Sequence, residues 1–137
     1  MAKEKSYGIC PYIIEDDCIK VLLNTSSWVS DYNFFKGKIE PNESIKECSI
    51  REFLEETSIS IDIKDLGEYF FQKNKRKDIG IYLVDYTKYK GMVIEVQEEE
   101  IYGYAWLDIN NTIILSKNQR EIFENIRKYL NKNKGKL

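Results

Sequence analysis

One acidic stretch in the middle of the chain constrains the fold more than any other. Ser44 is followed three residues later by Glu47, a pair that forms a capping box, so a helix is predicted to begin just after Ser44 and to end near Thr57. At about 100° per residue, three carboxylates share one arc about 100° wide: Glu52, Glu55 and Glu56. The opposite arc is the face expected to be buried, and it carries Ile50, Phe53 and Leu54.

This arrangement predicts three carboxylates that point outward together. Like charges so close repel each other, and a hard divalent cation such as Mg²⁺ relieves the repulsion because it prefers oxygen ligands. The plainer alternative is a solvated helix face. The spacing of the residues around the helix favours the metal site.

That spacing begins with Gly37 and runs through the helix. Five residues separate Gly37 from Glu43, and seven more separate Glu43 from the pair Arg51 and Glu52. Two more residues separate Glu52 from the pair Glu55 and Glu56, and an apolar residue, Ile59, closes the pattern. The pattern resembles the Nudix hydrolase signature, with one departure.

The departure is Ser58, which stands where the family has a glycine just past the helix. That glycine serves a left-handed C-terminal cap. Serine is less favourable than glycine at positive φ, which leaves open whether the turn is the same. No proposed metal ligand is lost.

Composition agrees with a small enzyme. The chain has 137 residues, 42% hydrophobic and 32% charged, with a formal net charge of −2, so one domain (1–137) is expected and a general attraction to nucleic acid is not. Three cysteines without a Cys-x-x-Cys pair argue against disulfides and zinc and favour a reducing cytosol. No histidine is present, which excludes histidine bases and ligands. No targeting segment or 18-residue apolar run appears, so a cytoplasmic protein without a membrane anchor is expected.

The rest of the chain reads as strands followed by a second helix. Strands are predicted at 7–14 and 18–23, joined as a hairpin, then at 66–72, 79–86, within 89–96 and at 101–107. Ser116 and Gln119 form a second capping box that predicts a helix over 117–130. The ends, 1–6 and 131–137, are expected to be flexible. This order predicts an α+β fold with a mixed sheet between two helices, which matches the α/β/α sandwich that the Nudix resemblance implies.

The resemblance also implies an activity and a set of residues. Nudix enzymes hydrolyse nucleoside diphosphate derivatives with Mg²⁺ or Mn²⁺. The expected metal ligands are the Gly37 carbonyl, Glu52, Glu55, Glu56 and one further carboxylate, Glu100. Glu52 is also a candidate base for the attacking water, and Arg51 is expected to hold a glutamate such as Glu43 in position, because an arginine stays protonated.

Segments outside the signature resemble the diadenosine tetraphosphate hydrolase branch of the family: 35–38 (FKGK), 77–83 (KDIGIYL) and 100–107 (EIYGYAWL). The expected phosphate contacts are Lys36, Lys38 and Lys77, and the expected base-stacking residues are Tyr82 and Tyr104. Asymmetric cleavage of a dinucleoside polyphosphate to ATP and AMP leads the hypotheses. Two others stay open: pyrophosphate removal from RNA 5′ ends, supported by the basic loop 73–77 (KNKRK), and a non-catalytic nucleotide-binding module. No obligate protein partner is indicated.

Overall fold

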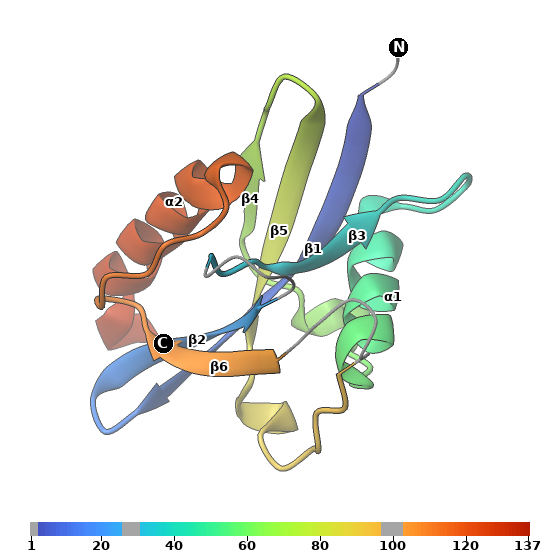
Figure 1. Cartoon of the computed structure of the whole chain (residues 1–137). Helices are drawn as coiled ribbons and strands as arrows, with labels where there is room; N and C mark the ends of the chain where they lie inside the picture. The colour runs from blue at the N-terminus through green and yellow to red at the C-terminus, as the bar shows by residue number, and fades with distance from the viewer. Residues whose placement is uncertain (1–2, 26–30, 97–102) are drawn as a thin grey trace.

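The computed structural model of the protein describes residues 3–25, 31–96 and 103–137. Within these ranges, six strands and two helices form the fold (Figure 1): β1 (Glu4–Glu15), β2 (Cys18–Thr25), β3 (Phe35–Lys38), α1 (Ile45–Thr57), β4 (Tyr69–Gln72), β5 (Lys77–Asp85), β6 (Gly103–Asp108) and α2 (Arg120–Lys132). Four short 3-10 turns complete it: η1 (Ile63–Asp65), η2 (Thr87–Tyr89), η3 (Lys117–Gln119) and η4 (Lys134–Lys136).

The first two strands form the predicted hairpin. Its two-residue turn is made by Asp16 and Asp17, which both have positive φ angles, 50° and 66°. Two successive positive φ angles are typical of the turns that match the twist of paired strands, and aspartate tolerates them better than most residues.

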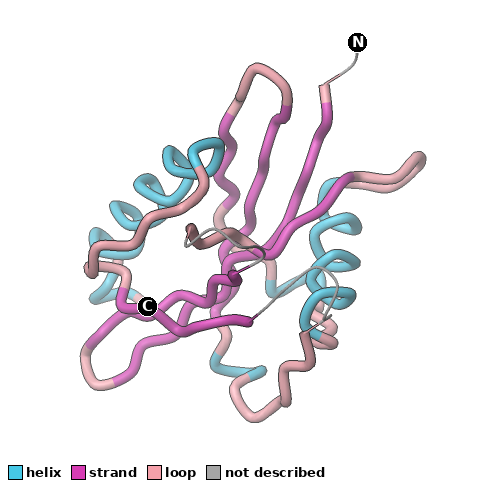
Figure 2. Tube along the Cα trace, in the orientation of Figure 1, coloured by secondary structure: helices cyan, strands magenta, loops and turns pink. Residues whose placement is uncertain are grey.

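The strands form one mixed sheet in the order β4-β5-β1-β2-β6. β1 and β5 pair in parallel, and the other strand pairs are antiparallel. β3 pairs with the first half of β1, from Ser6 to Ile9, whereas β2 pairs with its second half, from Tyr12 to Glu15. The two strands therefore share one edge of β1 and diverge from it, as the traces in Figure 2 show.

One helix covers each face of this sheet, so the α/β/α sandwich is confirmed (Figure 1). Phe53 of α1 packs against Ile9 and Phe35. Phe123 and Ile126 of α2 belong to the larger core cluster on the other face. Side chains alternate between the faces along each strand, and this is why neighbouring apolar residues of β1 and β5 contribute to different cores.

Two predictions about the strands are wrong. The predicted strand within 89–96 is absent: Tyr89 ends η2, and Met92 donates a backbone hydrogen bond to Tyr89, so the chain turns there instead of extending. The tyrosine hydroxyl fixes this turn through a 2.5 Å hydrogen bond to Asp65. At the N-terminus, the first strand begins at Glu4 and not at Tyr7, because residues 4–6 pair with β5.

The second predicted capping box is also wrong. The α-helix begins at Arg120 after the turn η3, and Ser116 makes no side-chain cap. Ser116 donates instead to Asn33, and the Gln119 side chain accepts from the Phe34 amide. The Gln72 side chain accepts hydrogen bonds from the first amides of α2. Local sequence patterns cannot predict this contact, because Gln72 is distant from α2 in the chain.

Within the described ranges, no helix combines the length and the apolar character that crossing a membrane requires.

Candidate active site

The acidic helix α1 begins and ends where the sequence predicts. The Ser44 hydroxyl accepts from the Glu47 amide at 3.0 Å, and the Glu47 carboxylate accepts from the Ser44 amide at 2.9 Å, which is the predicted capping box. At the other end, Ser58 takes the left-handed cap itself, with φ 66°, and donates its amide to the Leu54 carbonyl. The family's turn is therefore kept without the glycine.

The face that α1 buries differs from the prediction. Glu52 and Glu56 are only 8% and 5% exposed, whereas Leu54 is 43% exposed. The helix packs its carboxylate-bearing arc toward β3 and β1, and Phe53 at the margin of that arc supplies the apolar contact. The predicted outward-pointing carboxylates are therefore correct only for Glu55, which is exposed.

Gly37 makes room for this packing. A Cβ atom on Gly37 would lie 1.8 Å from a carboxylate oxygen of Glu52, so any side chain there would displace the glutamate. The Gly37 carbonyl accepts a hydrogen bond from the Cys48 thiol at 3.6 Å. A backbone carbonyl and a buried carboxylate thus lie side by side, one from the end of β3 and the other from the middle of α1.

Arg51 ties the acidic residues together. Its Nε and Nη2 atoms bind the two oxygens of Glu43 at 2.6 and 2.9 Å, and Nη1 lies 3.2 Å from Glu55 and 3.5 Å from Glu52. Nη2 also donates to the Lys38 carbonyl at 3.1 Å. The Arg51 guanidinium lowers the pKa of the Glu43 carboxyl, and Glu43 in turn raises the pKa of Arg51. Both groups are charged across the physiological range.

The donor set suits a hard divalent cation in kind, because it consists of carboxylates and a backbone carbonyl. In the described part of the chain, no three acidic, cysteine or histidine side chains converge on one point. The Arg51 guanidinium lies between Glu52 and Glu55 and supplies the positive charge there. The fifth predicted ligand, Glu100, lies outside the described residues.

The three predicted phosphate contacts lie on one face of the sheet, at different distances from Gly37. Lys36 pairs with Gly8 and Lys77 with Glu4, and strand alternation puts both lysines on the sheet face opposite to Gly37. Lys36 is half-buried; its pKa is lowered to about 8, first by burial and then by Lys77. Lys77 lies 3.6 Å from Glu4.

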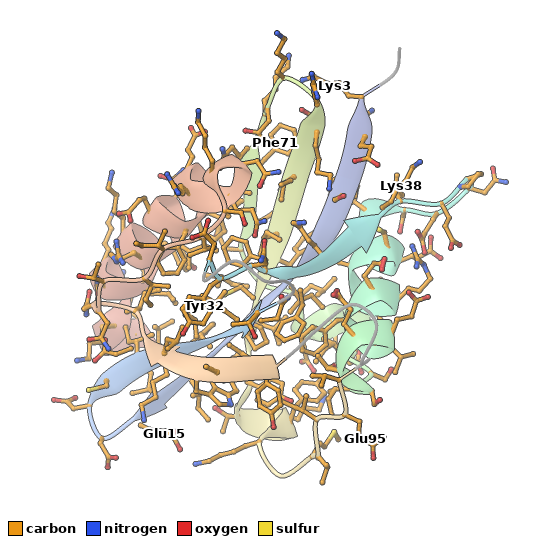
Figure 3. All side chains as sticks on the ribbon, in the orientation of Figure 1. Lys3, Glu15, Tyr32, Lys38, Phe71 and Glu95 are labelled. Atoms are coloured by element: carbon orange, nitrogen blue, oxygen red, sulfur yellow. The ribbon has the colours of Figure 1, made fainter. Side chains whose placement is uncertain are left out.

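Lys38 is exposed at the end of β3, beside α1 (Figure 3). Lys38 pairs with Ser6, so strand alternation puts its side chain on the same face as Lys36. Only its backbone carbonyl joins the Arg51 network.

The structure does not bring the two predicted base-stacking tyrosines into one group. Tyr82 of β5 packs against Tyr69, with ring centroids 4.7 Å apart. Gly80 provides the space for Tyr69, because a Cβ there would lie 2.0 Å from the Tyr69 hydroxyl. Tyr104 of β6 is 44% exposed and lines a separate pocket.

Two neighbours of the site were missed by sequence reasoning. Cys48 lies one helical turn before Glu52, so the i, i+4 spacing could have placed its thiol beside Gly37. Glu4, opposite Lys77, lies in residues 1–6, which look like a polar tip in the sequence. No local signal identifies it, because its role comes from the parallel pairing of β1 with β5.

Comparisons with known proteins agree with this geometry. A family model described as "NUDIX domain" matches residues 13–128. A curated relative, the NAD-capped RNA hydrolase NudC of Chromobacterium violaceum, is 33% identical over 79 residues, and this match covers 58% of the chain but only 29% of that protein.

Solved structures share the fold at low sequence identity. A Caenorhabditis elegans Ap4A hydrolase binary complex has a TM-score of 0.71 at 20% identity and covers 93% of this chain and 97% of its own. The NUDIX domain of Shewanella oneidensis NrtR, complexed with ADP ribose, has a TM-score of 0.70 at 16% identity, and the match covers 95% of this chain and 90% of that domain. A MutT protein from Methanosarcina mazei has a TM-score of 0.61 at 23% identity, and the match covers 94% of this chain and 97% of that protein.

Proposed function

The chain belongs to the NUDIX domain family. We propose that it is a hydrolase acting on pyrophosphate bonds and that it cleaves dinucleoside polyphosphates such as diadenosine tetraphosphate. The observation that carries the proposal is that α1 buries two carboxylates, Glu52, which lies against Gly37, and Glu56, one helical turn further on. Burying two carboxylates of like charge is costly unless a cation compensates them. Arg51 supplies part of this positive charge at 3.5 Å from Glu52, and a divalent cation would add to it.

Mg²⁺ or Mn²⁺ would be held by the Gly37 carbonyl and by Glu52, Glu55, Glu56 and Glu100. When bound, such an ion neutralises phosphate oxygens and lowers the pKa of a bound water. Glu52 takes the proton of the attacking water. Arg51 holds Glu43 most closely, at 2.6 Å, and lies farther from Glu52 and Glu55, at 3.5 and 3.2 Å. A bound cation would therefore displace Arg51 from Glu52 and Glu55 more easily than from Glu43.

The lysines suit a substrate with a long polyphosphate. Among the described strands β3 pairs with β1 alone, so its other edge is open. A polyphosphate that crosses this edge contacts Gly37 on one face and Lys36 on the other, and Lys77 lies further along that second face, on β5 beyond β1. Lysines act here as point charges, and their separation favours a chain of several phosphates over a single diphosphate.

The dinucleotide assignment has two further supports. The fold is shared with a protein described as an Ap4A hydrolase. The predicted stacking residues Tyr82 and Tyr104 lie at different places in the sheet, as two bases at the ends of one substrate require. Attack at an outer phosphate gives ATP and AMP.

An RNA 5′ end is the second candidate substrate, favoured by two observations. The curated relative is described as an NAD-capped RNA hydrolase. The segment 73–77, which leads from β4 to the first residue of β5, carries four basic residues, Lys77 among them. A non-catalytic nucleotide-binding module is the least favoured candidate, because every glutamate of the motif is retained.

A substrate panel tests the proposal. The purified protein is incubated with Mg²⁺ or Mn²⁺ and, in turn, diadenosine tetraphosphate, ADP-ribose and triphosphate-ended RNA. The fastest turnover is expected for diadenosine tetraphosphate, with none in the presence of excess chelator. Faster release of pyrophosphate from RNA would replace the dinucleotide assignment by the RNA one. No turnover of any substrate would favour the binding module.

A further inference from the structure

A pocket of about 290 Å³ lies away from the candidate active site, at the second half of β1. Ile13 lines it, six residues along β1 from Tyr7, the partner of Gly37. At about 3.3 Å per residue this separates the pocket from Gly37 by about 20 Å along the strand. In Figure 3 another lining residue, Glu15, appears at the opposite end of the molecule from Lys38.

Aromatic rings form the wall of this pocket. Trp106 and Tyr86 pack together, with ring centroids 5.3 Å apart and planes inclined by 58°. Tyr104 stands beside them on β6 and is 44% exposed. Tyrosine and tryptophan supply large, stiff contact surfaces that lose little conformational freedom when a planar group stacks on them.

The opposite wall is apolar and incompletely covered. Met92 and Val93 line the pocket and are 52% and 76% exposed. They lie in the segment that replaces the predicted strand, and Glu95 anchors that segment to α1 through a backbone hydrogen bond to Thr57. Glu15 and Lys90 form an ion pair of 2.9 Å at the pocket, so its charged groups neutralise each other.

Tyr86 lines the pocket and carries a buried polar group. Its side chain is 2% exposed, and its hydroxyl is buried without a hydrogen-bond partner in the described part of the chain. Burial raises the pKa of this phenol, so the hydroxyl is neutral and can donate. A buried hydroxyl without a partner destabilises the fold, and a ligand that offers an acceptor to this hydroxyl would remove that cost.

We propose that this pocket binds one uncharged planar ring with a hydrogen-bond acceptor, of the nucleobase class, stacked against Tyr104 and Trp106 and accepting from the Tyr86 hydroxyl. The volume lies at the small end of ligand pockets, which fits one ring system and excludes a whole dinucleotide. The neutral rim disfavours phosphate. The choice of a nucleobase rests on the proposed function, whereas the existence of a ring-binding pocket does not.

Tryptophan fluorescence gives a direct test, because the chain has two tryptophans, Trp28 and Trp106. The Trp28→Phe protein retains Trp106 as its single tryptophan reporter. Adenosine is the probe, titrated without metal so that hydrolysis plays no part. Saturable quenching of Trp106 is expected. Unsaturable quenching, or none up to the solubility limit of adenosine, would overturn the proposal while leaving the hydrolase assignment to its own assay.

Variants assign the binding to the named residues. Tyr104→Ala in this background should weaken adenosine binding at least about fivefold, because it removes one stacking surface. Tyr86→Phe should also weaken binding yet leave the melting temperature unchanged or higher, because the hydroxyl it removes has no partner. Tyr12→Phe, which removes a hydroxyl from the α2 side of the sheet, is the matched control. Unchanged affinity in both pocket variants would overturn the proposal.

The ring can come from the substrate or from a free nucleoside, and kinetics separate the two. If the substrate's own second base occupies the pocket, adenosine raises the KM for diadenosine tetraphosphate and Tyr104→Ala raises it as well. If a free nucleoside is the ligand, neither change affects KM although the quenching persists.

Discussion

At the scale of single residues, the absence of a side chain at Gly37 decides where the Glu52 carboxylate lies. The glycine has no special backbone angle, and its function is purely steric. This explains in physical terms why the signature spacing begins with a glycine: the carboxylate of the helix must reach the backbone of the strand.

Gly37→Ala should therefore reduce hydrolysis by more than tenfold. The new methyl group would occupy the position of the Glu52 carboxylate and push it away from the Gly37 carbonyl. Gly91→Ala is the control, because a Cβ there meets nothing within 4 Å. Steady-state rates of the two variants measure the effect, and equal rates would show that the position of Glu52 is not critical.

Glu56→Gln should reduce turnover by more than tenfold, a transition-state loss above about 1.4 kcal/mol. The amide keeps the shape of the side chain but loses the charge that holds a cation. Because the change also relieves repulsion between glutamates, the melting temperature should change little. Glu68→Gln, at an exposed position, is the control. Turnover of the Glu56 variant within tenfold of wild type would refute the ligand assignment.

The lowered pKa of Lys36 predicts that substrate binding depends on pH. Its pKa is lowered to about 8 because burial disfavours the charged form. The ammonium therefore loses its proton as the pH rises through 8, and KM for the polyphosphate should increase between pH 7 and 9. Lys36→Arg keeps its charge over this range and should flatten the profile. A profile of the same shape in both proteins would exclude Lys36 as its cause.

At the scale of elements, helix α1 shows how far local sequence reasoning extends. The capping box and the spacing fix both of its ends, since these depend on hydrogen bonds between near neighbours. The buried face could not be predicted by ranking side chains by polarity, because the helix buries Glu52 and Glu56 and exposes Leu54. The contact of α1 with β3, where Glu52 lies against Gly37, determines which face of the helix is buried. The start of α2 was missed for the same reason, since Gln72, 49 residues away, supplies its cap.

Ser58→Gly should stabilise the protein by about 0.5–1 kcal/mol. Serine has a φ of 66° there, a conformation that costs a side-chain-bearing residue about 1–2 kcal/mol. The loss of the 3.3 Å hydrogen bond from the Ser58 hydroxyl to Glu95 offsets part of this gain. Ser60→Gly, where φ is not positive, should be neutral or destabilising. Urea unfolding of both variants makes the comparison, and a destabilised Ser58 variant would contradict it.

At the scale of the whole molecule, the sheet separates the groups that the sequence places together. Lys36 and Gly37 are neighbours in the chain but emerge on opposite faces of β3, beside the open edge of that strand. The mixed sheet and the two helices were predictable from the order of apolar segments. The pairing of β1 with both β3 and β2 was not, because it depends on where two distant segments share one edge. Glu100 lies outside the described residues, so its role as the further carboxylate stays a prediction.

The most direct measurement of the central claim is the product distribution from diadenosine tetraphosphate. The enzyme is incubated with the dinucleotide and Mg²⁺, and the nucleotides are separated by ion-exchange chromatography at early times. Equal amounts of ATP and AMP are expected, because the phosphates bind on one side of the attacked phosphorus and water enters at an outer position. Two ADP molecules, or no cleavage alongside rapid pyrophosphate release from triphosphate-ended RNA, would contradict the account.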